Sequence, residues 1–294
     1  IDLLLRHADQ AMYAAKESGK NQFRHFDLDS HVLRKERDRV LEQAPDAIAE
    51  RQYELYLQPK INLSSQTVEG FEALIRWNHP KDGLLAPGAF LPHLEYTEYA
   101  AELGRFVIDE AMAMLDQWSL EGLSYSLSIN LSPSHFLSDG FMADLKSALA
   151  GKDSVLKSRL VLEILETTTL DNTAKVIANL AECRALGVQI SLDDFGTGYS
   201  SLDYFRRLDV DEIKIDRSFV SEMLENPDDE LIVGAIIALS HNFGRRIVAE
   251  GIETRDVQDR LIAMGCEVGQ GFYYTRPIPH KQALEWAATF SPAA

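Results

Sequence analysis

From Tyr53 onward the chain alternates short β-branched runs with amphipathic helical stretches, and this alternation restricts the fold more than any other feature. Such alternation is typical of a mostly parallel sheet, because parallel strands need a crossover connection that a helix supplies. About eight strands over about 240 residues favour a TIM-like (β/α)₈ barrel, with an open sheet as the alternative. The expected strands are LYLQPKI, TVEGFEALIRW, SYSLSINL, RLVLEIL, VQISLDD, EIKID, RIVAEG and CEVGQGFY.

Two stretches between these strands have the spacing of amphipathic helices. The first, NTAKVIANLAECRAL, begins near Asp171 and ends at Gly187, a residue type common at helix C-termini. The second, DDELIVGAIIALSHNF, has Pro227 and Asp228 at its start. The side chains expected to face the core are Val176, Ile177, Leu180 and Cys183 in the first helix, and Leu231, Ile232, Ala235, Ile236 and Leu239 in the second.

The residues before Tyr53 do not follow this alternation of strands and helices. Residues 3–18 have one apolar helical face, Gly19 follows as a stop, and NQFRHF is typical of a short strand. One helix and one strand cannot bury their apolar faces alone, so this segment resembles the end of another domain. A charged helix follows, and Pro45 is expected to end or interrupt it. We therefore predict a fragment at residues 1–28, a linker helix at residues 29–50 and the barrel at residues 51–294.

The formal net charge of −17 argues against binding to a nucleic-acid polymer, which requires a basic surface. The sequence has no apolar run of about 18 residues that could contact a membrane as a span, and no secretion signal. Cys183 and Cys266 lack metal-ligand spacing and are typical of core residues in a reducing compartment. We expect a cytoplasmic chain, which segments outside this sequence could still tether to a membrane.

Polar side chains occur at or near the carboxyl ends of most expected strands. In a barrel these ends meet at one mouth, where the catalytic groups of such enzymes lie. One such residue alone is more often turned to solvent, but several buried carboxylates at one mouth require cations among them. Oxygen ligands suit Mg²⁺ or Mn²⁺ better than zinc. The residues are Glu72, Asn130, Glu163, Asp193, Asp194, Lys214, Glu250 and Gln270.

The adjacent Asp193 and Asp194 suggest two metal ions. Neighbouring side chains on a strand point to opposite faces, so the chain must turn here if both are to reach the mouth. The next segment supplies two glycines for such a turn, and a connecting loop capped by Asp194 is the alternative. This segment comprises Phe195, Gly196, Thr197, Gly198, Tyr199, Ser200 and Ser201.

The motifs Glu72-Ala73-Leu74, Arg76-Trp77 and Asp193-Asp194-Phe195-Gly196-Thr197-Gly198-Tyr199 occur in this order along the chain. With them, the sequence from about Tyr53 to Pro292 resembles the EAL family of cyclic di-GMP phosphodiesterases. The opening ADQAMYAAKESGKN is similar to the end of a GGDEF (diguanylate cyclase-like) domain. The resemblance implies a piece of a larger two-module signalling protein and a barrel with one antiparallel strand near its start.

The resemblance also implies hydrolysis of cyclic di-GMP to linear pGpG by metal-activated water, with two Mg²⁺ or Mn²⁺ ions as cofactors and Ca²⁺ as an inhibitor. By position, Lys214 corresponds to the cation beside the attacking water and Glu250 to its acid–base or ligand partner, with Glu72 and Asp193 in the same catalytic group. The implied metal ligands are Glu72, Asn130, Glu163, Asp193, Asp194 and Asp216, and the implied substrate contacts are Gln58, Gln270 and Arg76, the last directed at phosphate.

A further group of residues is implied to couple the metal site to a homodimer. Glu166 resembles the family residue that anchors the loop after Asp194, and Glu253 is expected to act similarly at the dimer-forming end. The loop residues Phe195 to Ser201 belong to this group. An isologous dimer through the barrel follows from the resemblance.

The sequence departs from the family pattern at three places. Leu165 replaces the usual Thr between two glutamates, and we expect it to point away from the metal ligands and to alter packing only. The segments EYTEY at residues 95–99 and Tyr273-Tyr274-Thr275 are also unusual. Either is expected to affect the guanine pocket, through loop shape or stacking.

Three other functions compete with hydrolysis. A receptor that binds cyclic di-GMP without cleaving it would typically lack metal ligands or the glutamate of the AEG motif, both of which this chain retains. An enolase-like barrel pairs carboxylates and a lysine with Mg²⁺, but it does not explain the DDFGTGYSS loop. A dimerising partner without a ligand is the third alternative.

Overall fold

The computed structural model describes residues 28–170, 173–197 and 202–290. The predicted fragment at residues 1–28 lies almost wholly outside this range. Across the described residues, every helix is too short or too polar to form a membrane-spanning segment.

The strands that we expected from the sequence are confirmed, and two short strands add to them. All ten belong to a single sheet. Their bounds are β1 Tyr53–Asn62, β2 Thr67–His79, β3 Gly83–Leu85, β4 Ser126–Asn130, β5 Leu160–Leu165, β6 Gln189–Phe195, β7 Glu212–Ile215, β8 Arg246–Ala249, β9 Val268–Gly269 and β10 Ile278–Pro279.

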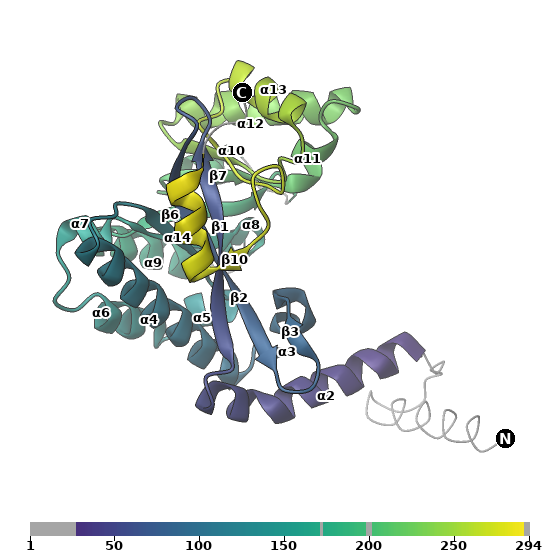
Figure 1. The fold of residues 1–294 in the computed structure, drawn as a ribbon, viewed down its shortest axis with the longest axis vertical. Coiled ribbons are helices and arrows are strands. Elements are labelled where there is room, and N and C mark those ends of the chain that lie inside the picture. Colours follow the sequence, from purple (N-terminus) through teal and green to yellow (C-terminus); the bar gives the residue numbers. More distant parts are fainter. Residues whose placement is uncertain (1–27, 171–172, 198–201, 291–294) are drawn as a thin grey trace.

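Eight of the described strands close into a barrel, which confirms the predicted fold class. β2 and β4–β9 run parallel to one another, each paired with the next. β1 closes the circle by pairing antiparallel with both β2 and β9. In Figure 1, β1 and β2 form a long hairpin that runs the height of the barrel. The single reversed strand is therefore the first one, as expected.

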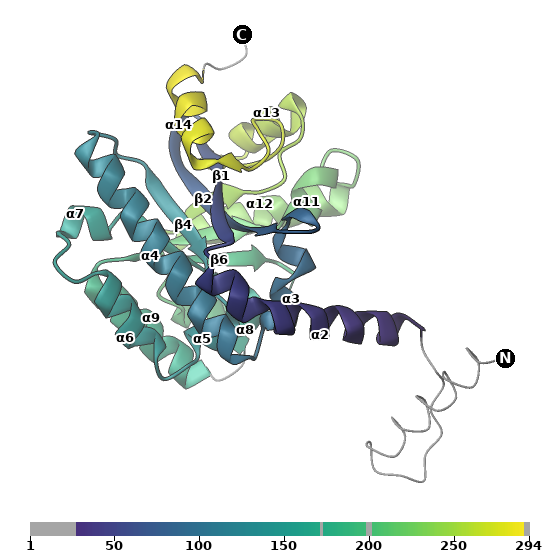
Figure 2. The same ribbon diagram turned by 60° about the horizontal axis from the view of Figure 1, so that its bottom comes forward.

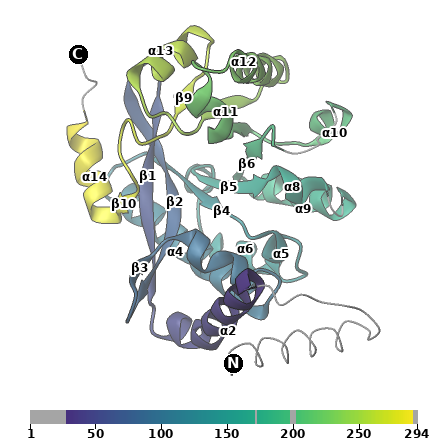
Figure 3. The same cartoon turned by 90° about the vertical axis from the view of Figure 1, so that its right-hand side faces the viewer.

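Helices lie around the outside of the barrel, with α14 beside β1 (Figure 3). Their bounds are α2 Leu28–Ala49, η1 Pro87–Ala89 (a 3₁₀ helix), α3 Leu91–Leu94, α4 Glu98–Leu120, α5 Pro133–Phe136, α6 Phe141–Ala148, α7 Ser154–Lys157, α8 Glu166–Leu170, α9 Thr173–Leu186, α10 Leu202–Arg207, α11 Arg217–Glu222, α12 Pro227–Asn242, α13 Arg255–Ala263 and α14 His280–Thr289.

The helix α2 packs on the barrel through its C-terminal half, and its N-terminal half projects away from it (Figure 2). Val40, Ala44 and Ala47 are buried, which explains why the helix continues beyond the position where we expected it to stop. The prediction that Pro45 ends or interrupts the helix is wrong, since Pro45 lies inside α2. Burial of the small side chains on either side offsets the loss of one backbone hydrogen bond.

The inward faces of the two predicted helices are partly corrected. Val176, Leu180 and Cys183 are buried in α9, whereas Ile177 is partly exposed. In α12 the prediction is confirmed for Ile236, which is buried with Val233, Ile237 and Ser240. It is wrong for Leu231, Ile232 and Ala235, which face solvent, and Leu239 is half-buried. This helix is apolar around most of its circumference, so the sequence alone does not identify its inward face. Cys183 and Cys266 are free and buried, as expected of core residues.

Candidate active site

The polar residues that we expected at the strand ends lie together at the barrel mouth. A cavity of about 600 Å³ opens there. Its floor is polar, and residues of α3, α4 and the β4–α5 loop form a largely apolar wall. The cavity is lined by these predicted site residues: Gln58, Glu72, Asn130, Asp193, Asp194, Glu250, Glu253 and Gln270.

Lys214 lies at the centre of the carboxylates and is almost completely buried. Its Nζ is 2.7 Å from Oε2 of Glu163 and 2.7 Å from Oε1 of Glu250. It is also 3.1 Å from Oδ1 of Asp193 and 3.7 Å from Oε2 of Glu72. β7 places this lysine inside the barrel because Ile213 and Ile215 on either side of it pack outward under the helices. One ammonium group therefore contacts four carboxylates from four different strands or strand ends.

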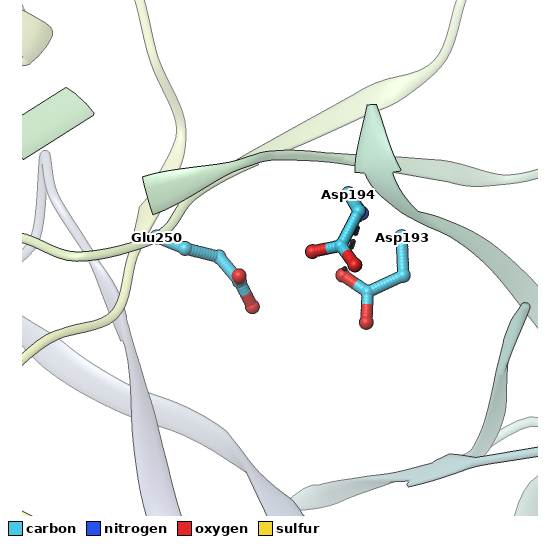
Figure 4. Close-up of side chains that lie close together, drawn as sticks. All are labelled: Asp193, Asp194 and Glu250. Carbon is cyan, nitrogen blue, oxygen red and sulfur yellow. Dashed lines mark hydrogen bonds between the residues drawn. The ribbon is translucent and has the colours of Figure 1, made fainter. Parts of the chain in front are cut away.

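Asp193, Asp194 and Glu250 can bring one carboxylate oxygen each within 4.8 Å of one another. Figure 4 shows the two aspartates approaching the same space from β6 and Glu250 approaching it from the opposite side. The turn that this requires is present, because Asp194 has a φ of 55° and the β6–β7 register shifts between Leu192 and Phe195. The left-handed backbone at Asp194 is what brings two consecutive side chains to one mouth.

Burial raises the pKa of Glu163, Asp193 and Glu250, although the nearby Lys214 acts in the opposite direction. The pKa of Asp194 is raised to about 7 by burial and by the charges of Asp193 and Asp216. Burial alone would lower the pKa of Lys214, but the surrounding carboxylates raise it well above its usual value. The site thus holds more negative charge than its lysine compensates.

Amide side chains orient Glu72 at the mouth. Asn130 Nδ2 donates to Glu72 Oε1 at 2.6 Å, and Gln270 Nε2 donates to Glu72 Oε2 at 2.5 Å. Gln270 also donates to Gln58 Oε1 at 2.9 Å. The carbonyl oxygen of Gln270, Oε1, is buried without a hydrogen-bond partner among the described residues.

A second polar layer lies beneath the mouth, and our reasoning from the sequence missed it. Lys60 Nζ donates to Ser128 Oγ at 2.7 Å and to Glu212 Oε1 at 2.9 Å, and all three residues are buried. The alternation of Gln58 with Lys60 on β1, and of Glu212 with Lys214 on β7, is the signal that could have identified it, since alternate side chains share a face.

The side-chain oxygen atoms at the mouth are suited to binding divalent cations. Oε1 of Glu163 is fully buried and accepts no hydrogen bond from any residue that the structure describes. The ligand atoms near it are carboxylate and amide oxygens, the type that Mg²⁺ and Mn²⁺ prefer.

Asp216 is an exception within the predicted set of metal ligands: its carboxylate caps α11 by accepting a hydrogen bond from the backbone N–H of Ser218 at 2.9 Å. It lies close enough to Asp194 to raise the pKa of that residue.

Other predicted site residues lie further from this cluster. Arg76 donates through Nη1 to the backbone oxygen of Ile75 at 2.9 Å, lies over the ring of Tyr56, and does not line the cavity. Glu166 Oε2 accepts from the backbone N–H of Gly196 at 2.9 Å, and Phe195 packs against Phe205. Thr197 donates to the backbone oxygen of Asp194 at 2.9 Å. Gly198, Tyr199, Ser200 and Ser201 lie outside the described residues.

Two departures from the family pattern have different surroundings from those we expected. Leu165 lines the cavity, so the expectation that it points away from the metal ligands is wrong. It follows Glu163 by two positions on β5, and alternate strand residues share a face. Tyr274 donates to Gln258 Oε1 at 2.7 Å and, with Tyr273, lines a separate cavity on the flank of the barrel. Glu95, in contrast, does line the cavity at the mouth.

The fold and the donor set together define a barrel protein with a cluster of carboxylates at its mouth whose oxygen atoms could hold a divalent metal ion. Comparison with known families makes this assignment more specific: residues 41–277 match the model of the EAL domain. This match extends over most of the chain, and the chain belongs to the EAL domain family.

Relatives and solved structures agree with this membership. The chain is 40% identical over 283 residues to the bifunctional diguanylate cyclase/cyclic di-GMP phosphodiesterase MucR of Pseudomonas aeruginosa, covering 96% of this chain and 41% of the relative. The structure of a PaMucR phosphodiesterase in complex with c-di-GMP has a TM-score of 0.79 at 40% identity, with 83% of this chain and 99% of that chain covered. An EAL domain protein from Listeria monocytogenes has a TM-score of 0.74 at 32% identity, with coverages of 83% and 96%.

Proposed function

We propose that this chain hydrolyses cyclic di-GMP to linear pGpG with the help of divalent metal ions. The observation that carries the proposal is the cluster of Glu163, Asp193, Glu250 and Lys214 at the barrel mouth, in which Asp193 and Glu250 line an open cavity. The c-di-GMP complex of the similar PaMucR phosphodiesterase supports the choice of substrate. The chain spans 41% of the length of MucR, so the activity of a whole protein that contains it is part of this proposal.

The cavity suits a ligand with apolar faces and an anionic centre. Its volume of about 600 Å³ is in the usual range for a small-molecule site. Leu91, Leu103 and Pro133 are among the apolar residues of its wall, and the wall can accommodate a planar base. The acidic floor repels a phosphate in the absence of cations, so binding of this substrate depends on metal.

We assign the metal ligands from the donor atoms at the mouth. Glu72, Asn130, Glu163 and Asp193 would hold one ion, and Asp193 and Asp194 a second, with Asp216 contributing through water. Mg²⁺ or Mn²⁺ would offset the charge of the phosphodiester and make a proton easier to remove from water. Ca²⁺ is proposed to bind without supporting turnover.

Two side chains of the protein, Glu250 and Lys214, are proposed to transfer the proton and to stabilise the negative charge of the transition state. The oxygen of a water molecule attacks phosphorus, the bond from phosphorus to the leaving 3′-oxygen breaks, and one proton passes from the water to that oxygen overall. Glu250 is placed to accept and return the proton, because its carboxylate lines the cavity beside Lys214, 2.7 Å from Nζ. Lys214 remains charged and offsets negative charge that develops in the transition state.

The direct test is incubation of the purified protein with cyclic di-GMP and Mg²⁺ or Mn²⁺, followed by chromatography of the products. Linear pGpG as the product, and its loss on addition of EDTA, is the expected result. Binding of cyclic di-GMP without any product would instead make the chain a receptor. No binding and no product would contradict both assignments.

A pH effect on metal binding follows from Asp194. Its pKa of about 7 in the folded protein, against 3.8 for an unperturbed aspartate, means that metal-free stability falls as pH rises between these values. Metal binds only the ionised form, so Mn²⁺ will raise the melting temperature more at pH 8 than at pH 6. Differential scanning fluorimetry at a fixed Mn²⁺ concentration measures this, and equal shifts at both pH values would contradict it. Asp194→Asn should weaken the pH effect.

A second expectation concerns Leu165, which lines the cavity. Leu165→Thr exchanges an apolar wall contact for a hydroxyl without touching the carboxylates, so KM should change and kcat should stay within about tenfold of its original value. Steady-state kinetics with cyclic di-GMP separate the two constants. A change from an inactive protein to a fully active one would show that this departure from the family pattern matters far more than we propose.

We further propose the arrangement of the longer protein. Residues 1–28 are the end of a GGDEF-like module, residues 29–50 link it to the barrel at residues 51–294, and the barrel forms a homodimer in the cytoplasm. The bifunctional name of MucR and the projection of α2 from the barrel support the first two points. The coupling of the dimer to the metal site would run through Glu166, Glu253 and the loop after Asp194.

A further inference from the structure

The second polar layer contains the ammonium group of Lys60, which lies near the proposed metal ligands but makes no direct hydrogen bond to them. Lys60 Nζ lies 3.6 Å from Oε1 of Glu163, and both side chains are almost completely buried. At the same time it is held at 2.9 Å by Glu212 and at 2.7 Å by Ser128. Among the described residues, Lys60 therefore has two near partners and one more distant one.

The more distant partner is the oxygen that accepts no hydrogen bond. Oε2 of Glu163 pairs with Lys214 at 2.7 Å, whereas Oε1 is buried and lacks a hydrogen-bond partner in the described part of the chain. A buried ammonium and a buried carboxylate normally approach to about 2.7–2.9 Å, because a desolvated charge is costly without a direct partner. Something must therefore keep Lys60 from closing the remaining distance.

Glu212 supplies the competing attraction. It lies on β7, two positions before Lys214, and its carboxylate accepts directly from Lys60. Its negative charge balances the positive charge of Lys60, so the buried pair carries no net charge. Lys60 and Glu163 belong to β1 and β5, and the ammonium lies 2.9 Å from Glu212 Oε1 against 3.6 Å from Glu163 Oε1.

We propose that Glu212, assisted by Ser128, is a positioning residue that holds the Lys60 ammonium off Oε1 of Glu163 and so keeps this oxygen available to a divalent metal ion. This inference rests on the proposed metal-dependent function, and it concerns residues beyond the ligand set proposed above. Without Glu212, Lys60 moves onto Glu163 and competes with the metal as an internal cation.

The test measures Mn²⁺ binding directly, by isothermal titration of the metal-free protein without nucleotide. Glu212→Gln keeps the shape of the side chain and removes its charge, so the affinity for Mn²⁺ should fall about tenfold or more, as for other residues that orient metal ligands. Lys60→Met in the same protein removes the competing cation and should return the affinity to within about threefold of the original. Ser128→Ala should weaken binding in the same direction but less.

A matched control is available on the outer surface. Glu182→Gln removes the same charge from a partly exposed glutamate that pairs with Lys146, and it should leave Mn²⁺ affinity unchanged. Circular dichroism and the melting temperature in EDTA establish that each variant folds. Ser128→Ala leaves both buried charges in place and keeps the test usable if Glu212→Gln does not fold.

The possible outcomes separate this inference from the proposed function. If the unaltered protein binds no Mn²⁺, the proposed metal site fails and the positioning role fails with it. If the unaltered protein binds Mn²⁺ and folded Glu212→Gln, or Ser128→Ala in its place, binds equally well, only the positioning role is overturned. A double variant as weak as Glu212→Gln alone would also overturn it, because the loss would not then come from Lys60.

Discussion

Replacing Lys214 by methionine will both slow hydrolysis strongly and destabilise the metal-free protein. The side chain is almost completely buried and contacts carboxylates of Glu163, Asp193 and Glu250 within 3.1 Å. Removing one partner from such a buried network leaves uncompensated charge and typically costs about 3–5 kcal/mol of unfolding free energy. The loss of a cation that offsets transition-state charge should lower kcat by about 10²–10³-fold.

Two measurements separate these effects. Urea denaturation in EDTA gives the stability of the metal-free protein, and the same experiment in Mn²⁺ should recover more stability for Lys214→Met than for the unaltered chain. Lys146→Met is the control, since Lys146 pairs with Glu182 on the surface and such pairs contribute little. A fully active Lys214→Met variant, or one as stable in EDTA as the unaltered protein, would contradict the central role of this lysine.

Replacing Glu250 by alanine is expected to abolish turnover while leaving nucleotide binding largely intact. Glu250 is placed at the edge of the cluster, where its carboxylate contacts Lys214 and can approach Asp193 and Asp194. A residue that transfers a proton in the transition state contributes about 10²–10⁴-fold to kcat. The affinity for cyclic di-GMP, measured in Ca²⁺ so that no hydrolysis occurs, should change by less than about tenfold.

The isosteric Glu250→Gln sharpens this experiment. It keeps the volume and a hydrogen bond but cannot accept the proton, so its kcat should be as low as that of the alanine variant. Glu225→Ala, on an exposed surface, is the control for the loss of a single glutamate. Unchanged turnover in Glu250→Ala would remove this residue from the mechanism, and a matching loss of nucleotide affinity would make it a binding residue.

The barrel was predictable because parallel strands leave a distinct pattern in the sequence. Runs buried on both faces, separated by helices, can pack in few ways, and polar residues at the ends of those runs share one edge. The doubled aspartate at Asp193 and Asp194 carried additional information. Two adjacent acidic side chains on one strand reach the same mouth only through a local turn, and Asp194 has the left-handed backbone that such a turn needs.

The features that could not be predicted depend on distances between strands. Lys60 and Glu212 are 152 positions apart and lie on β1 and β7, which do not pair with each other, so their contact appears only when the register of the barrel is known. Leu165 illustrates a simpler error, because its position two residues after Glu163 should have placed both on one face. The buried face of α12 was missed since its apolar residues surround the helix, and only neighbouring elements select the buried side.

The reversed direction of β1 determines how the barrel is joined to the chain before it. Because β1 runs opposite to its neighbours, α2 delivers the polypeptide at the rim where the carboxylates converge, not at the far end. There α2 contacts α3, and Leu91 and Leu94 of α3 belong to the cavity wall. Attachment point and substrate entrance are thus at one end of the molecule, so a twist or pull applied along α2 acts directly on α3 and α4, the two helices that supply much of the cavity wall.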